Sequence, residues 1–238
     1  MENNLSSIEQ KLGYKYNNIS LLENALTHSS FANETKARGK RAESNERLEF
    51  LGDSVLAVIA SEYLYLRLKN YKEGELTKVR AAVVCEESLC NFAESLELGA
   101  ALYLGNGEIA SNGRNRKSIL ADAFEAVLGS VFLDGGLEAA KKFLLSFIEK
   151  AVDNVIKEGE LQDYKSLLQQ LIQQNGTGEV LEYVLVSESG PDHDKIFDIS
   201  VALNNNILGQ GRGRSKKIAE QNAAREALAL FGVNNEKI

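Results

Sequence analysis

Two carboxylates, Glu49 and Asp53, lie four residues apart in NERLEFLGDSVL, residues 45–56, a segment that otherwise has the pattern of an apolar helix. Like charges at this spacing repel by about 0.2–0.5 kcal/mol when solvated, and burying them without a partner is far less favourable. On a wheel at about 100° per residue, Glu46 joins them in a wedge of roughly 60°. A solvated face normally carries Lys or Arg at the next turn, and this one does not. The pattern therefore favours a ligand that stabilises several negative charges.

A second helical segment, NRKSILADAFEAVLGSVFLDGG, repeats this arrangement, with Asp122 and Glu125 three residues apart on one face. Ala126 and Gly129 lie beside them, and small residues let helices approach closely. We hypothesise that the four carboxylates converge: Glu49, Asp53, Asp122 and Glu125. Converging carboxylates without histidine suit a hard divalent cation, Mg²⁺ or Mn²⁺, of the kind that supports phosphodiester hydrolysis. For Glu46, near the start of its helix, a solvated or capping role is an open alternative.

The composition is that of an ordinary globular protein, and the net charge of the 238 residues is −7. Because residues 161–238 are also acidic, with 8 Lys and Arg against 10 Asp and Glu, any nucleic-acid contact must come from a local patch. No segment has the roughly 18 consecutive apolar residues of a membrane span. The polar N-terminus does not resemble a secretory signal, and two isolated cysteines, Cys85 and Cys90, suggest reduced thiols in a cytoplasmic protein.

Apolar residues recur at helical spacing through residues 1–157, with continuous patterns at 44–68, 76–98, 119–133 and 137–156. The segments 30–44 and 105–113 have the composition of loops, and the charged stretch 156–165 that of a linker. The last part then changes to a helix, three short strands and a final helix. Ser215 is a candidate N-cap of that helix, and Gly232 follows its end.

Lys216 and Lys217 lie at the start of this final helix, where cations oppose the helix dipole unless a phosphate is bound. Arg212 and Arg214 precede them in a glycine-rich turn. The alternative is a solvated lysine pair. His193, in GPDHDK between two strands, could reach a groove, although a loop histidine is usually solvated. His28 lacks the partners of a Ser/His/Asp site.

These motifs resemble bacterial ribonuclease III over nearly the whole chain. NERLEFLGDSVL is similar to the signature motif of the family, and ADAFEAVLGSVFLD to its second acidic helix. DYKSLLQQ, GPDH and GQGRGRSKKIAEQNAA are similar to its double-stranded-RNA-binding domain. The resemblance implies an all-α endonuclease domain, residues 1–157, followed by a small α+β domain of the order α-β-β-β-α, residues 162–232.

The resemblance also implies roles for individual residues. The four carboxylates form the catalytic cluster, in which Mg²⁺, or Mn²⁺ as a substitute, is held by Glu49, Asp122 and Glu125. Asp53 and Glu125 match the catalytic positions, Glu46 and Glu73 match auxiliary acids, and Phe50 matches an aromatic at a homodimer interface. The RNA-contacting positions are matched by Gln169, His193, Ser215, Lys216, Lys217 and Gln221. Asp192 and Asp194 make the GPDHDK loop more acidic than is usual, which could weaken phosphate contact.

By this resemblance the chain is a Mg²⁺-dependent endonuclease of double-stranded RNA, acting as a cytoplasmic homodimer with no membrane association. Its products carry 5′-phosphate and 3′-hydroxyl ends with short 3′ overhangs, and its substrates are rRNA precursors and some mRNAs. One rival is a non-catalytic double-stranded-RNA-binding protein or chaperone, which would have one of the four carboxylates replaced. Another is a metal-dependent phosphohydrolase of small nucleotides, against which the RNA-binding domain argues.

Overall fold

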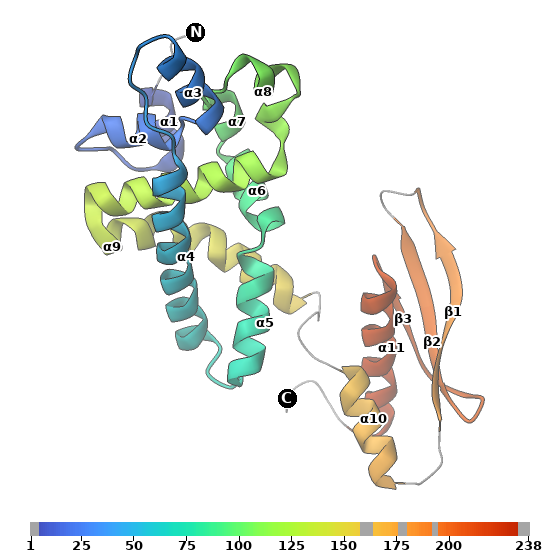
Figure 1. Cartoon of the computed structure of the whole chain (residues 1–238). Coiled ribbons are helices and arrows are strands. Elements are labelled where there is room, and N and C mark those ends of the chain that lie inside the picture. Colours follow the sequence, from blue (N-terminus) through green and yellow to red (C-terminus); the bar gives the residue numbers. More distant parts are fainter. Residues whose placement is uncertain (1–4, 158–163, 176–179, 192–194, 233–238) are drawn as a thin grey trace. The chain divides into compact units, whose positions relative to one another are not determined.

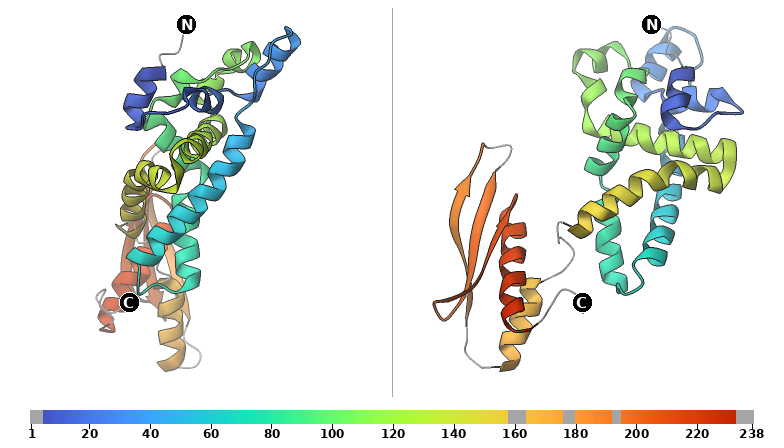
Figure 2. Two further views of the ribbon diagram at one scale, coloured as in Figure 1. Left: turned by 90° about the vertical axis from the view of Figure 1, so that its left-hand side faces the viewer. Right: turned by 180° about the vertical axis from the view of Figure 1, so that it is seen from behind.

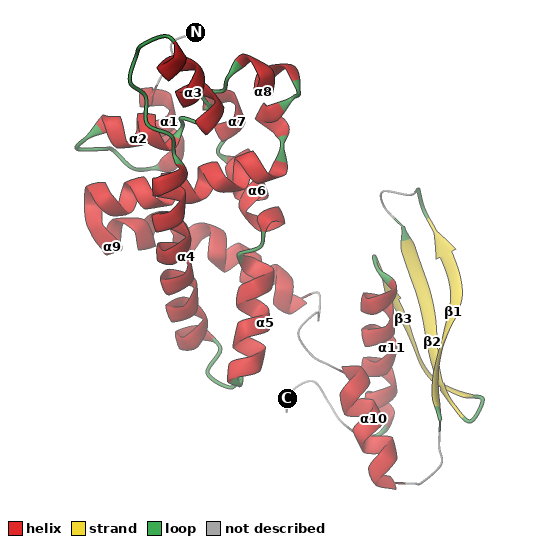
Figure 3. Cartoon of the chain, viewed as in Figure 1, coloured by secondary structure: helices red, strands yellow, loops and turns green. Residues whose placement is uncertain are grey.

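The computed structural model describes residues 5–157, 164–175, 180–191 and 195–232, in two compact units that divide between Asp153 and Asn154. The first unit is all-helical, and the second combines helices with an antiparallel sheet, as the sequence predicts (Figure 3). The domain bounds 1–157 and 162–232 stay a prediction. In the described ranges, no helix is both long and apolar enough to cross a membrane.

The first unit is built around two long helices, α4 (Glu46–Arg67) and α9 (Lys117–Lys157), which cross in Figure 1. A kink at Gly136, where φ is 77°, divides α9 at the boundary between the two predicted patterns. Four phenylalanines from α6 and both halves of α9 pack with ring centres 5.2–5.6 Å apart: Phe92, Phe124, Phe143 and Phe147. The other elements are α1 (Leu5–Leu12), α2 (Ile19–Ala25), α3 (Ser29–Ala37), α5 (Glu73–Val83), α6 (Glu86–Ser95), α7 (Leu98–Ala101), α8 (Asn106–Ala110) and the 3₁₀ turn η1 (Gly113–Asn115).

Three predictions within this unit were wrong. The segment 30–44 contains most of α3, whose N-cap is His28, a residue outside the usual capping types. The segment 105–113 contains α8 and the start of η1. The pattern 76–98 is broken after Val83, because Cys85 has extended φ and ψ angles and caps a new helix, α6, that begins with two glutamates.

The second unit has the predicted order α-β-β-β-α: α10 (Tyr164–Asn175), β1 (Leu181–Ser189), β2 (Ile196–Leu203), β3 (Asn206–Gly213) and α11 (Lys216–Leu230). The strands pair antiparallel in the order β1-β2-β3, and both helices cover one face of the sheet (Figure 2). Between these layers lies an apolar core: Tyr164, Leu168, Ile172, Val201, Ala223, Ala224, Ala227 and Leu228. Ser215 caps α11, accepting a hydrogen bond from the Ile218 backbone N–H at 3.2 Å.

Alternate glycines on β3 bring α11 onto the strand. A β-carbon at Gly211 would lie 2.1 Å from the Ala219 carbonyl oxygen, and one at Gly209 would lie 2.5 Å from that of Ala223. The helix backbone therefore rests directly on β3, which explains the glycines of GQGRG without any phosphate-loop function. This packing fixes the position of the lysines at the start of α11.

Candidate metal centre and RNA-binding surface

The acidic site lies where α4 and α9 cross, and two glycines allow the crossing. A β-carbon at Gly52 would lie 1.9 Å from the Glu125 carbonyl oxygen, and one at Gly129 would lie 2.3 Å from that of Leu48. The two helices therefore touch through their backbones. The prediction of a close approach beside Gly129 is confirmed, whereas sequence reasoning missed Gly52. The sequence does carry a sign of this contact, because Gly52 lies inside a helical pattern. Glycine there is unfavourable by about 1 kcal/mol relative to alanine, so its presence indicates a packing constraint.

This close approach gathers three carboxylates. One oxygen from each of Glu49, Asp122 and Glu125 lies within 4.8 Å of the others, and all three side chains are half-buried. Asp53 lies outside this group and is exposed, but its charge is near enough to raise the pKa of Glu125. The structure thus brings three of the four predicted carboxylates together, with the fourth beside them.

The electrostatics of the cluster disfavour its full ionisation. Burial, followed by the charges of Asp53, Glu49 and Asp122, raises the pKa of Glu125 to about 7. Burial and the charges of Asp122, Glu46 and Asp53 raise the pKa of Glu49. Because a nearby cation would relieve both penalties, the cluster has the donor chemistry of a hard divalent metal site.

Asp122 also faces two residues that sequence reasoning did not connect with the site. Burial raises its pKa, the charge of His28 lowers it, and the charge of Glu86 raises it further. The ring of His28 is held by Ser30, whose backbone N–H donates to its Nδ1 at 3.2 Å. His28 therefore lies near the carboxylate cluster, and its interaction as the N-cap of α3 fixes the position of its ring.

The start of α4 is anchored to the rest of the unit by Asn45, which is 3% exposed. Its backbone N–H donates to the Thr27 carbonyl at 2.8 Å, and its Nδ2 donates to the Ala25 carbonyl at 3.3 Å. These bonds attach the first turn of α4, which carries Glu46 and Glu49, to the backbone at Ala25 and Thr27.

The predicted auxiliary acids lie apart from the three-carboxylate group. Glu46 is exposed and accepts a hydrogen bond from Ser44 Oγ at 2.7 Å. Glu73 is the exposed first residue of α5, and its Oε1 accepts from Thr77 Oγ1 at 3.1 Å. Both acids thus have local partners, and Glu46 influences the cluster through its charge on Glu49.

Phe50 is 78% exposed on α4, between Glu49 and Asp53 in sequence. Val58 and Tyr65, further along the same helix, are 57% and 72% exposed. Large apolar side chains exposed along one helix form the kind of surface that protein–protein contacts cover.

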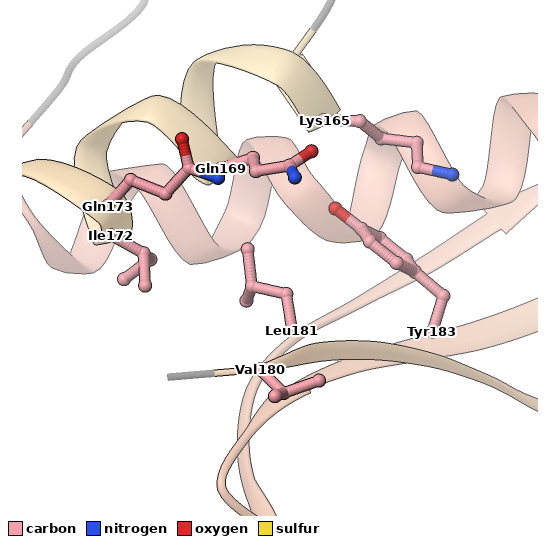
Figure 4. Close-up of a pocket in the computed structure, with 7 residues that line it drawn as sticks. All are labelled: Lys165, Gln169, Ile172, Gln173, Val180, Leu181 and Tyr183. Carbon is pink, nitrogen blue, oxygen red and sulfur yellow. The ribbon is translucent and has the colours of Figure 1, made fainter. Parts of the chain in front are cut away.

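In the second unit, the predicted RNA-contacting residues come from both helices. Gln169 is exposed on α10 and lines a pocket of about 370 Å³ together with Lys165, Ile172, Gln173, Val180, Leu181 and Tyr183 (Figure 4). Lys216 and Lys217 are exposed at the N-terminus of α11, behind the Ser215 cap. His193, with Asp192 and Asp194, lies outside the described residues.

Besides Ser215, the N-cap of α11, two of these predicted positions have internal partners. Gln221 Oε1 accepts a hydrogen bond from the Lys165 backbone N–H at 3.2 Å, which joins α11 to α10. The Lys216 ammonium lies 5.9 Å from the centre of the Phe197 ring on β2. Arg212, from the same patch, pairs with Asp198 at 3.7 Å.

Comparison with known proteins divides the chain in the same way. A family model described as ribonuclease-III-like matches residues 18–152, and one described as a double-stranded RNA binding motif matches residues 164–230. A ribonuclease 3 from Caldanaerobacter subterraneus subsp. tengcongensis is 49% identical over 229 residues, 96% of this chain and 99% of the relative. A ribonuclease 3 from Pelotomaculum thermopropionicum is 50% identical over 228 residues, 95% and 93% of the two chains.

Solved structures agree for the first unit. The nuclease domain of ribonuclease III from Campylobacter jejuni is 42% identical, with a TM-score of 0.56, and covers 63% of this chain and 96% of that one. A second structure of that domain, reported for flexibility in a region involved in dimer formation, has a TM-score of 0.57 at 42% identity, covering 62% and 98% of the two chains.

Proposed function

The chain belongs to the ribonuclease III family and is an endoribonuclease of that type, and we propose that it cuts double-stranded RNA with Mg²⁺ held by Glu49, Asp122 and Glu125. The observation that carries this proposal is the convergence of these three carboxylates within 4.8 Å, in a chain that also carries a double-stranded RNA binding motif. Mn²⁺ offers the same preference for oxygen ligands and is the expected substitute.

A divalent metal at such a site lowers the pKa of bound water and stabilises charge on phosphate oxygens. The protein contributes the placement of the ligands, which the Gly52 and Gly129 contacts fix. Asp53, exposed beside the cluster, is proposed to accept a proton from the attacking water, with Glu125 as the second catalytic carboxylate. Glu46 and Glu73 are proposed as auxiliary acids at the edge of the site.

The second unit is proposed to supply affinity for the duplex. Double-stranded RNA is recognised mainly by shape, through contacts to 2′-hydroxyls and phosphates. Lys216 and Lys217, at a capped helix N-terminus, provide an anion site for the phosphates. The remaining proposed contacts are Gln169, His193, Ser215 and Gln221. This local patch reconciles RNA binding with a net charge of −7.

We propose that two copies associate through the exposed face of α4 that carries Phe50, so that each copy cuts one strand of the duplex. Without a partner that covers it, the 78% exposure of Phe50 is unfavourable for a side chain of this size. The Campylobacter jejuni nuclease domain, which has a region involved in dimer formation, supports this association. Cleavage in this arrangement is proposed to leave 5′-phosphate and 3′-hydroxyl ends with short 3′ overhangs, on cytoplasmic rRNA precursors and some mRNAs.

The test is incubation of the full chain with a long labelled RNA duplex, with Mg²⁺ or with EDTA, beside the Glu125→Gln variant. We expect short duplex products only with Mg²⁺ and wild-type protein, while the variant still binds the duplex. Glu149→Gln, which changes an exposed acid on the second half of α9 outside the carboxylate group, is the matched control and should retain wild-type activity. Cleavage that continues in EDTA, or at full rate in Glu125→Gln, would overturn the proposed site.

A further inference from the structure

We propose that Lys165 is a positioning residue for RNA binding, which holds Glu220 so that Lys216 remains available to a phosphate. This inference rests on the proposed RNA-binding function of the second unit. It assigns a role to a residue of α10 whose own ammonium group is directed to the protein.

Three contacts fix Lys165. Its Nζ lies 2.7 Å from Glu220 Oε2 on α11 and 4.4 Å from the centre of the Tyr183 ring on β1. Its backbone N–H donates to Gln221 Oε1 at 3.2 Å. Figure 4 shows Lys165 extending from α10 above the Tyr183 ring, with Gln169 one turn further along. A single residue in the first turn of α10 therefore contacts both the second turn of α11 and the sheet.

Glu220 is the residue that needs to be held. It lies in the same part of α11 as the lysine pair, four residues after Lys216 and three after Lys217, the spacings at which opposite charges on a helix pair. A carboxylate that bonded Lys216 would remove one cation from the patch and would place a negative charge beside the phosphates. In the structure Glu220 bonds Lys165, and the Lys216 ammonium instead lies 5.9 Å from the Phe197 ring centre.

The contacts of the Lys165 side chain also favour this positioning role over a direct contact with phosphate. The Lys165 side chain is 35% exposed and Glu220 27%, so their ion pair is partly shielded from solvent. A phosphate that contacted Lys165 would have to compete with the Glu220 carboxylate and the Tyr183 ring for its ammonium group. Lys216 and Lys217 are exposed and lie at a helix N-terminus, where the dipole adds to their attraction for an anion.

The test measures the salt dependence of duplex binding by the full chain in EDTA, by fluorescence anisotropy of a labelled RNA. The slope of log K against log salt becomes shallower by roughly 0.9 for each phosphate that the protein no longer neutralises, a value known for duplex DNA. We expect Lys165→Met to make the slope shallower by the equivalent of about one phosphate, because Glu220 then captures Lys216. The double variant Lys165→Met with Glu220→Gln should recover the wild-type slope, and Lys165→Arg should keep it.

The other outcomes are distinct. A double variant as defective as Lys165→Met would show that Lys165 itself contacts phosphate, and this overturns the inference. An unchanged slope in Lys165→Met, even with a lower Tm, would reduce Lys165 to a purely structural role and also overturns it. Lys216→Ala tests the premise separately. If that variant keeps the wild-type slope, the proposed phosphate contact of Lys216 fails, and the inference fails with it.

Discussion

Gly52 of α4 lies against the backbone of Glu125 of α9, so closely that a β-carbon at residue 52 would be 1.9 Å from the Glu125 carbonyl oxygen. The same helix turn of α9 carries Asp122 and Glu125 into the three-carboxylate group. The helix contact that determines how closely the backbones approach therefore also determines how closely the carboxylates approach. A metal site with oxygen ligands depends on that spacing.

Gly52→Ala is predicted to abolish cleavage. The added methyl group must push α4 and α9 apart, since the atom it meets is backbone and cannot rotate away. Overpacking of this kind typically destabilises by about 1–3 kcal/mol. Cleavage rate and Tm should both fall. Gly74→Ala, at a helical glycine whose added β-carbon would meet nothing within 4 Å, is the control; it should keep the wild-type cleavage rate and should not lower Tm, because alanine is favoured over glycine in a helix. Full activity of Gly52→Ala would mean that the crossing distance does not matter.

Glu125→Gln is predicted to stabilise the protein in the absence of metal. Folding raises the pKa of Glu125 to about 7, so between about pH 4.3 and 7 the folded state binds more protons than the unfolded state. The contribution of this group to the free energy of unfolding therefore decreases as pH rises through that window. Thermal melts in EDTA at pH 5 and pH 8 should show a larger gain in Tm for the variant at pH 8.

Mg²⁺ should reverse the order of stability of the wild type and Glu125→Gln. A ligand that binds only the folded state stabilises it by RT ln(1 + [L]/Kd), so added Mg²⁺ should raise the Tm of the wild type and not that of Glu125→Gln. Glu149→Gln should respond to Mg²⁺ as the wild type does, because Glu149 is exposed and lies outside the carboxylate group. An equal Mg²⁺ response in Glu125→Gln would count against Glu125 as a ligand.

Much of the carboxylate site could be predicted from sequence, because helical spacing fixes which side of a helix a residue occupies. This spacing places Glu49 and Asp53 on one face of their helix, and Asp122 and Glu125 on one face of theirs. It does not show how deeply each acid is buried, so the separation of exposed Asp53 from the other three emerged only from the structure. His28 was missed near Asp122 because the two residues are far apart in sequence, and the local capping interaction of His28 with Ser30 does not indicate which helix lies opposite.

The second unit shows a similar division. The order of helices and strands follows from local periodicity and turn residues, so it was predicted correctly. The contacts of Lys165 with Glu220 and Tyr183 join residues distant in sequence and left no local pattern. The glycines of GQGRG are visible in the sequence, but the reason for Gly211, which lies within β3 under α11, is defined only by the packing of the two elements.

Phe50→Asp is predicted to convert a dimer into a monomer with little cleavage activity. A charge at the centre of an apolar contact would be buried without a partner on association, which is strongly unfavourable. Light scattering coupled to size-exclusion chromatography measures the mass directly. Ile109→Asp, at a side chain 48% exposed on α8, is the control and should leave the mass unchanged. A Phe50→Asp variant that remains dimeric would place the interface elsewhere.

Gly211→Ala is predicted to unfold the second unit selectively. The new β-carbon would lie 2.1 Å from the Ala219 carbonyl oxygen and 2.2 Å from the Ala223 nitrogen, so α11 must lift from β3. Duplex affinity should fall at least tenfold, while Mg²⁺ still stabilises the first unit in a thermal melt. Gln210→Ala changes an exposed neighbour on the same strand and should preserve binding. Wild-type affinity in Gly211→Ala would show that this packing does not position the lysines.

Asp134→Ala is predicted to destabilise the first unit in a pH-dependent way. The carboxylate accepts hydrogen bonds from Tyr14 Oη at 2.7 Å and from the backbone N–H groups of Asn17 and Asn18 at 2.8 Å. Burial alone would raise the pKa of Asp134, but the hydrogen bonds from Asn17, Tyr14 and Asn18 outweigh it and lower that pKa. This stabilisation is fully present above the ordinary carboxyl pKa of about 3.9 and is lost as pH falls through the lowered value.

Urea unfolding should therefore show a loss of about 0.5–1.5 kcal/mol in Asp134→Ala at pH 7, the net contribution expected when hydrogen bonds near the surface are removed. The difference from wild type should shrink as pH falls below about 3.9, because protonation weakens the same hydrogen bonds in the wild type. Glu138→Ala removes an exposed acid just beyond the kink at Gly136 and should be nearly neutral at both pH values. A destabilisation by Asp134→Ala that stayed constant with pH would show that side-chain packing, and not the ionised carboxylate, stabilises the segment 14–18.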